Sequence, residues 1–300
     1  MTPKESKLDY NYFMSFFIFA WIASVAYGAE VVLAKLTSKY SLKNPWAFNF
    51  LWNVMLVLLI APIAYFNGLG IPKMWGNIFL AGATTAIFSS IYIYVLYKID
   101  VSVASPLFNF RTIFALFFGA VMLHETIFNW QYPLIAVTVI AGFFVTYNEK
   151  FSLKSFFNFH VLLLIIGMSV LAIYSVFLNR AIADTGYWNA TFWNMVLVPF
   201  FLLPTVPFFK KDVRKVNLKQ LGGLTIVSIA GIVGVIASNV AYASNVGITS
   251  VIISIPFSML MVIFLAAFWP TLLEKHTAKV YAVRLLAAAV MIISALKLSS

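Results

Sequence analysis

Residues 220–273 contain no charged side chain over 54 consecutive positions. A surface that faces water needs charge, and soluble domains carry about 25% charged residues, whereas this chain carries 10% and has a mean hydropathy of +0.96. Lipid is therefore the expected solvent for most of the chain. A helix crosses the hydrocarbon core with about 20 apolar residues, so this segment is too long for one crossing. We expect it to break at residues 243–247 (ASNVG).

The same length criterion divides the whole chain into ten predicted spans. They cover residues 12–36, 45–66, 74–97, 101–123, 130–148, 158–179, 188–209, 220–243, 250–272 and 278–297. Pro45 after Asn44 is typical of a helix start, and Asn67-Gly68 indicates a turn. The sequence therefore predicts an all-α polytopic membrane protein with ten transmembrane helices.

Residue types and motifs argue against several classes of function. The chain has no cysteine, which removes disulfides, thiolate metal sites and thiol catalysis. Its three histidines are scattered, and HExxH, GxSxG and glycine-rich phosphate motifs are missing. The formal charge of +11 falls in short segments between apolar blocks, where bases face anionic headgroups rather than nucleic acid. We expect no enzyme activity, cofactor, metal site, nucleic-acid partner or obligate protein partner.

The two halves of the chain repeat each other. Residues 51–53 (LWN) recur as residues 192–194 (FWN). Further on, a constant offset of 149 residues pairs Ser105 with Ser254, Asn109 with Ser258, and Glu125 with Glu274. Each half holds five predicted helices, and an odd number makes the second half enter the membrane in the opposite sense. We therefore expect domains at 1–150 and 151–300, related as inverted repeats, with Ser105 and Ser254 facing each other across a central cavity.

The distribution of lysine and arginine predicts the orientation. Connections after the first, third, fifth, seventh and ninth helices carry 13 of these residues, against 5 on the other side. Basic connections stay in the cytoplasm. The count therefore places both termini outside a cell membrane, although Lys4 and Lys7 oppose it.

One segment of the first half carries a family pattern. It comprises residues 97–107 (YKIDVSVASPL), 115–119 (ALFFG) and 123–125 (LHE), with a weaker version ending at residues 272–275 (LLEK). This pattern resembles the drug/metabolite transporter superfamily, specifically proteins made of two EamA-type domains, in which glycine usually stands at the position of His124. The resemblance implies ten helices around a central cavity and the export or exchange of small metabolites.

Glu30 and Arg111 are the main candidates for function because they lie inside predicted spans, where a charge costs about 2.5 to 3.5 kcal/mol. The repeat offset places Leu260 opposite Arg111, and broken symmetry fits a cargo-specific contact. Each residue has an alternative interpretation. For Glu30, the alternative is a side chain that reaches the membrane interface near Lys35. For Arg111, it is a structural pair with Glu30 or with backbone carbonyls.

Hydroxyl and amide side chains recur at spacings of three and four residues, which places them on one helix face. They are Ser102, Ser105 and Asn109 in one half, and Ser250, Ser254 and Ser258 in the other. Tyr92, Asn239 and Tyr242 add polar groups on neighbouring helices. We expect these side chains to bind cargo in a wet groove, with helix packing as the alternative. The pairs Trp52-Asn53 and Trp193-Asn194 are expected to brace their helices.

These features favour a secondary transporter of a small amphipathic metabolite such as an amino acid. Arg111 would attract a carboxylate, and Glu30 a proton or an amine. Residues 29–32 (AEVV) resemble a segment of the small multidrug resistance proteins, which implies that Glu30 exchanges protons, and Tyr27 on the same face is placed to donate a hydrogen bond to it. With no nucleotide motif, an ion or substrate gradient would supply the energy. The alternative is a non-transporting membrane scaffold or lipid-handling protein; a channel is disfavoured because no ring of charges appears.

Overall fold

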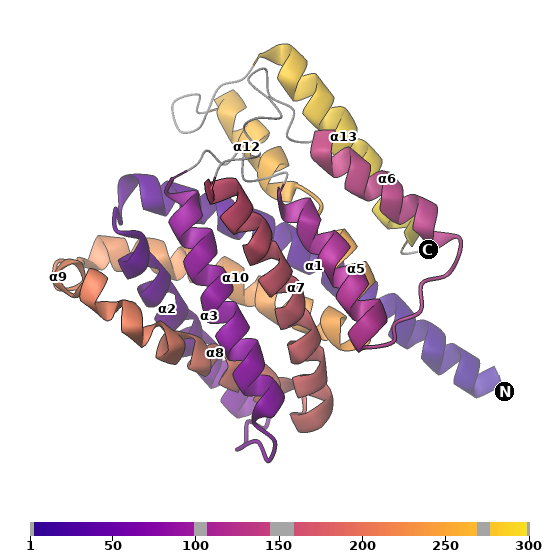
Figure 1. The fold of residues 1–300 in the computed structure, drawn as a ribbon, viewed down its shortest axis with the longest axis horizontal. Helices are drawn as coiled ribbons and strands as arrows, with labels where there is room; N and C mark the ends of the chain where they lie inside the picture. The colour runs from indigo at the N-terminus through magenta and orange to yellow at the C-terminus, as the bar shows by residue number, and fades with distance from the viewer. Residues whose placement is uncertain (1–2, 99–106, 145–158, 269–276, 299–300) are drawn as a thin grey trace.

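The structure is a computed structural model that describes residues 3–98, 107–144, 159–268 and 277–298 (Figure 1). All regular structure in these ranges is helical. The elements are α1 (Pro3–Tyr40), α2 (Pro45–Phe66), α3 (Gly76–Leu96), α5 (Phe108–Met122), α6 (Gln131–Phe144), α7 (Phe159–Thr185), α8 (Tyr187–Leu202), the 3-10 helix η3 (Leu203–Phe208), α9 (Lys210–Val213), α10 (Leu218–Ser244), α11 (Val246–Ile253), α12 (Phe257–Phe268) and α13 (Ala278–Leu298).

Eight helical segments in the described ranges are long and apolar enough to cross a membrane, with α8 and η3 counted as one segment (Tyr187–Phe208) and α11 and α12 as another (Val246–Leu265). Two further apolar helices, α5 and α6, are shorter, with 15 and 14 residues. Large apolar side chains such as Phe66 and Leu286 are 84% and 70% exposed, which suits contact with lipid rather than water. These features confirm the predicted all-α polytopic membrane protein.

Local signals fix the ends of several helices where the sequence predicted them. The Asn44 side chain accepts hydrogen bonds from the Trp46 and Ala47 amides at 3.0 and 3.3 Å, and α2 starts at Pro45. A side chain in this position satisfies amides that the first helical turn leaves without partners. In contrast, α7 runs to Thr185, beyond the predicted end at 179, and stops where Gly186 adopts a φ of 84°. Glycine tolerates this left-handed backbone.

The long uncharged segment breaks twice instead of once. The expected break is confirmed, because α10 ends at Ser244 and the Asn245 side chain accepts from the Ile248 amide at 2.7 Å. The predicted span over 250–272 contains a second, unexpected break, because α11 ends at Ile253 and α12 begins at Phe257, although Val246–Leu265 is still long and apolar enough for one crossing. Pro256 explains the second break: it has no amide hydrogen and disfavours helical backbone in the residue before it.

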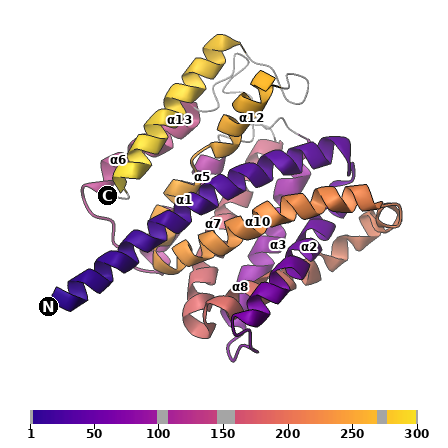
Figure 2. The ribbon, with the colours of Figure 1, turned by 180° about the vertical axis from the view of Figure 1, so that it is seen from behind.

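The helices of the first half pack mainly against helices of the second half. α1 runs alongside α10 and α3 alongside α7, and α6 pairs with α13 at one side of the fold (Figures 1 and 2). Close approach depends on glycine at two crossings. A β-carbon on Gly28 would lie 2.7 Å from the Phe257 Cβ, and one on Gly82 would lie 2.7 Å from the Leu197 Cβ. In lipid, the hydrophobic effect contributes little to helix association, because the lipid tails are as apolar as the helices. Close van der Waals contact between backbones therefore stabilises the packing instead.

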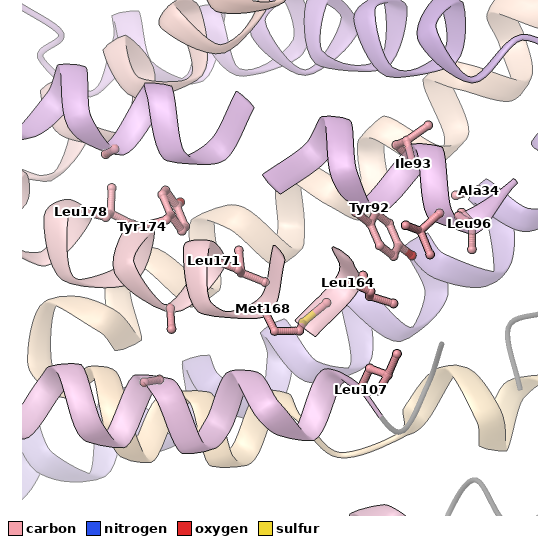
Figure 3. Packing of buried hydrophobic residues seen from close by; sticks show 14 of the residues in the cluster. Ala34, Tyr92, Ile93, Leu96, Leu107, Leu164, Met168, Leu171, Tyr174 and Leu178 are labelled. Atoms are coloured by element: carbon pink, nitrogen blue, oxygen red, sulfur yellow. The ribbon is translucent and has the colours of Figure 1, made fainter. Parts of the chain in front are cut away.

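A buried apolar cluster joins α3 and α5 of the first half to α7 and α10 of the second half. Figure 3 shows Tyr92, Leu96, Leu107, Met168 and Leu171 within it. Leu107 and Met168 are fully buried. The cluster holds Tyr92 and Tyr174 at fixed positions beside the central cavity.

Candidate functional site

A cavity of about 240 Å³ lies at the centre of the fold. Its wall includes residues of α1, α2, α3, α5, α6, α7, α10, α11, α12 and α13. The broken segment at residues 254–256 also faces it. Both halves of the chain therefore build this space, as expected for a central cavity.

Most of the predicted site residues meet at this cavity. Those that line it are Tyr27, Glu30, Tyr92, Asn109, Arg111, Ser254 and Ser258. Asn239 and Tyr242 do not line it and lie behind the wall, fully buried. Ser105 falls outside the described residues, so its predicted position opposite Ser254 stays a prediction.

Glu30 lies in the interior of α1 and is 8% exposed. Its carboxyl group packs against α10 at Gly231, where any β-carbon would clash with the Glu30 Oε1 atom. Among the described residues, none forms a hydrogen bond or ion pair with this carboxyl. A buried carboxyl without a compensating partner is costly in its charged form. The structure thus places Glu30 in the wall of the cavity.

Arg111 lies in α5 and is 9% exposed. Its guanidinium carbon is 5.6 Å from the centre of the Tyr242 ring, within the range of a cation–π contact. The Arg111 Nε has no hydrogen-bond partner among the described residues. No ion pair joins Arg111 to Glu30 within this part of the chain. The two charged groups share one cavity while remaining apart.

Tyr27 lies close enough to both Glu30 and Arg111 to interact with each electrostatically. Its hydroxyl forms a 2.8 Å hydrogen bond with the Ser238 Oγ rather than with Glu30. Its ring lies against Gly234, where a β-carbon would come within 2.7 Å of ring atoms. Tyr27 is therefore held in place by α10, and the predicted bond from Tyr27 to Glu30 is not formed.

The remaining predicted residues combine lining and packing roles. The Ser254 hydroxyl donates to the Val251 carbonyl at 2.6 Å, and the Asn109 side chain packs against Gly142. Tyr92 stacks edge-on against Phe108 at 5.6 Å between ring centres. Asn239 donates to the Thr191 Oγ1 at 3.1 Å. Some residues of this set therefore line the cavity and others pack between helices, and their binding of cargo stays a prediction.

Four aromatic residues of the wall were absent from the predicted site: Trp52, Phe88, Phe108 and Tyr174. Tyr174 of α7 lines the cavity, and its hydroxyl donates to the Asn239 Oδ1 at 3.5 Å. Its place on the first helix of the second half, as Tyr27 lies on the first helix of the first half, was the available signal. Trp52 was assigned a bracing role but also lines the cavity, together with Asn53. The counterpart Trp193 instead donates to the Gly70 carbonyl at 2.8 Å.

Comparisons with known proteins agree with this architecture. Residues 14–148 match the EamA-like transporter family. No curated protein matches the chain. A solved structure described as "Crystal structure of protein" aligns with a TM-score of 0.69 and 12% sequence identity, over 95% of this chain and 99% of that chain. The fold is thus shared over nearly the whole length, and residues 14–148 form an EamA-like transporter family domain.

Proposed function

We propose that the chain is a secondary transporter that moves a small amphipathic metabolite, such as an amino acid, through the central cavity. The observation that carries this proposal is the pair Glu30 and Arg111. Both are at least nine-tenths buried, both line the cavity, and neither has an ionic partner among the described residues. Charged groups within a membrane are costly and tend to mark transport pathways. A cargo with complementary charges would supply the missing partners.

The chemistry of the wall indicates how such a cargo would bind. The Arg111 guanidinium offers a fork of donors that suits a carboxylate. The Glu30 carboxylate would accept from an amine or bind a proton. Apolar and aromatic walls from Trp52, Phe88 and Tyr174 would hold the rest of the molecule. A cavity of about 240 Å³ is close to the lower end of common ligand pockets, so the cargo is small.

We propose that this transporter is built from two inverted repeats, 1–150 and 151–300, with ten membrane crossings in total. The first support is that α5 begins at Phe108 and α12 at Phe257, which differ by the 149-residue offset. The second is that α1 packs with α10 and α3 with α7. In the order of the repeats, α7 corresponds to α1 and α10 corresponds to α3, so exchanging the halves turns one of these pairs into the other. Gradient-driven transporters commonly place the cargo site between such repeats.

Transport by purified protein reconstituted in vesicles tests the function. Labelled amino acids and related amphipathic metabolites would be offered to vesicles with and without a pH gradient, in both directions. Accumulation above that in protein-free vesicles is the expected result. Absence of transport for the whole panel, with the protein folded, would favour a membrane scaffold or lipid-handling protein instead.

Placement in the cell membrane with both termini outside is a separate proposal, supported by the loop charges. Protease access to tags at each end of the chain in intact cells measures it directly. Protected tags at both ends would reverse the orientation without changing the transport proposal.

A further inference from the structure

Basic residues from two distant connections meet at one end of the fold. We call this surface the basic end, made of residues 35–43 and 203–219. It contains Lys35, Lys39, Lys43, Lys210, Lys211, Arg214, Lys215 and Lys219. Figure 2 shows the end of α1, α9 and the start of α10 on the same side of the molecule. The same two segments include one acid, Asp212, so eight bases minus one acid leave seven positive charges.

Hydrogen bonds tie the two connections together. The Asn44 side-chain amide donates to the Phe208 carbonyl at 3.1 Å and to the Asp212 Oδ2 at 2.6 Å. The Gln220 side-chain amide donates to the Ser41 carbonyl at 2.7 Å. Asp212 is thereby engaged within the fold. Lys210, Lys211, Arg214 and Lys215 around it are exposed, so their charges face outward, where an external anion can reach them.

Exposed apolar side chains lie among these bases. Phe208 is 66% exposed and Leu218 is 86% exposed. In contrast, Phe209 is buried and packs against Phe50 of α2, with ring centres 5.2 Å apart. The segment is anchored from inside by Phe209 and presents both apolar and basic groups outward. This combination is typical of protein surfaces that lie in the headgroup region of a bilayer.

We propose that the basic end binds anionic phospholipid headgroups, with Phe208 and Leu218 at the boundary of the acyl chains. The charge complementarity is strong because anionic lipids attract basic residues close to the surface. Setting topology requires positive charge near helix ends, but it does not require two connections held in one arrangement by hydrogen bonds. The fixed geometry favours a lipid-binding surface in addition to that role. This inference holds whether or not the central cavity transports cargo.

Thermal unfolding of the purified full-length chain in mild detergent tests the proposal. Phosphatidylglycerol or phosphatidylcholine would be titrated into the micelles, and native mass spectrometry would count bound lipids. The test variant is Lys210→Gln/Lys211→Gln/Arg214→Gln/Lys215→Gln, which keeps side-chain bulk but removes four charges. The matched control is Lys73→Gln/Lys279→Gln, because both lysines are exposed and lie outside the basic end.

Phosphatidylglycerol should raise the unfolding midpoint of the parent and of the control, and phosphatidylcholine should not. The quadruple variant should lose the shift, with apparent affinity for phosphatidylglycerol weaker by at least about a hundredfold. An unchanged shift in that variant would overturn the proposal. An equal shift from soluble inorganic phosphate would also overturn it, since the site would then take a free anion rather than a lipid.

A salt titration of the parent tests the proposal without requiring that the variant folds. Exposed ion contacts are screened by salt, so the shift caused by phosphatidylglycerol should shrink as sodium chloride rises. A shift that is independent of salt would contradict binding by the basic end.

Discussion

The Glu125 carboxylate accepts a hydrogen bond from the backbone amide of Gly247 at 2.9 Å, and a second one from Val246. Glu125 follows α5 in the first half of the chain, whereas both amides open α11 in the second half. The first amides of a helix have no partners within the helix and attract a carboxylate. Glu125 thus connects the two halves at the beginning of the broken helix.

Replacement of Glu125 by alanine should therefore destabilise the protein by about 1 to 3 kcal/mol, because two buried amides lose their acceptor. The midpoint of thermal unfolding in detergent measures the effect. Glu125→Gln retains one acceptor oxygen and should lose less. Equal stability of the parent and the alanine variant would show that water or another group replaces the carboxylate.

His124, which precedes this carboxylate, adopts a φ of 56°. The left-handed backbone places the β-carbon of any residue except glycine too close to the following carbonyl, at a cost of about 1 to 2 kcal/mol. This explains why glycine is usual there in the proteins that the sequence resembles. His124→Gly should stabilise the fold by about 1 kcal/mol, whereas His124→Ala, which keeps the β-carbon, should not. A glycine variant no more stable than the alanine variant would contradict this.

Local signals made much of the fold predictable. Asn44 and Pro45 identified the start of α2, and the segment 243–247 identified the break before α11, because caps and turns depend on neighbouring residues. The break before Pro256 was missed because the surrounding run is uncharged and long enough to span as one helix. Side-chain direction was the harder problem. Tyr242 carries the expected polarity but faces Arg111 from behind the wall, since the facing of a helix depends on which neighbours it packs against.

Gly231 and Gly222 offer a matched pair of substitutions in α10. A β-carbon on Gly231 would collide with the Glu30 carboxyl, whereas Gly222 has open space around this position. Gly231→Ala should displace Glu30 and lower gradient-driven transport by at least about tenfold, equivalent to about 1.4 kcal/mol. Gly222→Ala should leave transport at the parent level, since alanine favours a helix. Similar transport by both variants would mean that the position of Glu30 is unimportant.

Arg111→Leu introduces the residue that the repeat offset already places at the equivalent position, Leu260. The variant should fold, because the described contacts of Arg111 consist of packing and the ring of Tyr242. Loss of the donors should weaken binding of carboxylate-bearing cargo by at least about tenfold. Competition by the free acid and by its neutral amide separates the charge effect from a general loss of affinity. Unaltered kinetics for both would assign Arg111 a structural role.

Glu30→Gln tests whether Glu30 couples transport to protons. Glutamine keeps the shape of the side chain beside Gly231 and can still form hydrogen bonds, but it has no titratable proton. Exchange driven by cargo alone should therefore persist, whereas acceleration by a pH gradient should disappear. Tyr27→Phe is the companion variant, because it removes the bond to Ser238 while leaving the Glu30 carboxyl in place, and it should retain the response to the gradient. The measurement is initial uptake in vesicles with and without a pH difference, with binding of labelled cargo as a check on the site. If Glu30→Gln responds to the gradient as the parent does, another group carries the proton, and Glu30 serves only to bind cargo or to pack against α10.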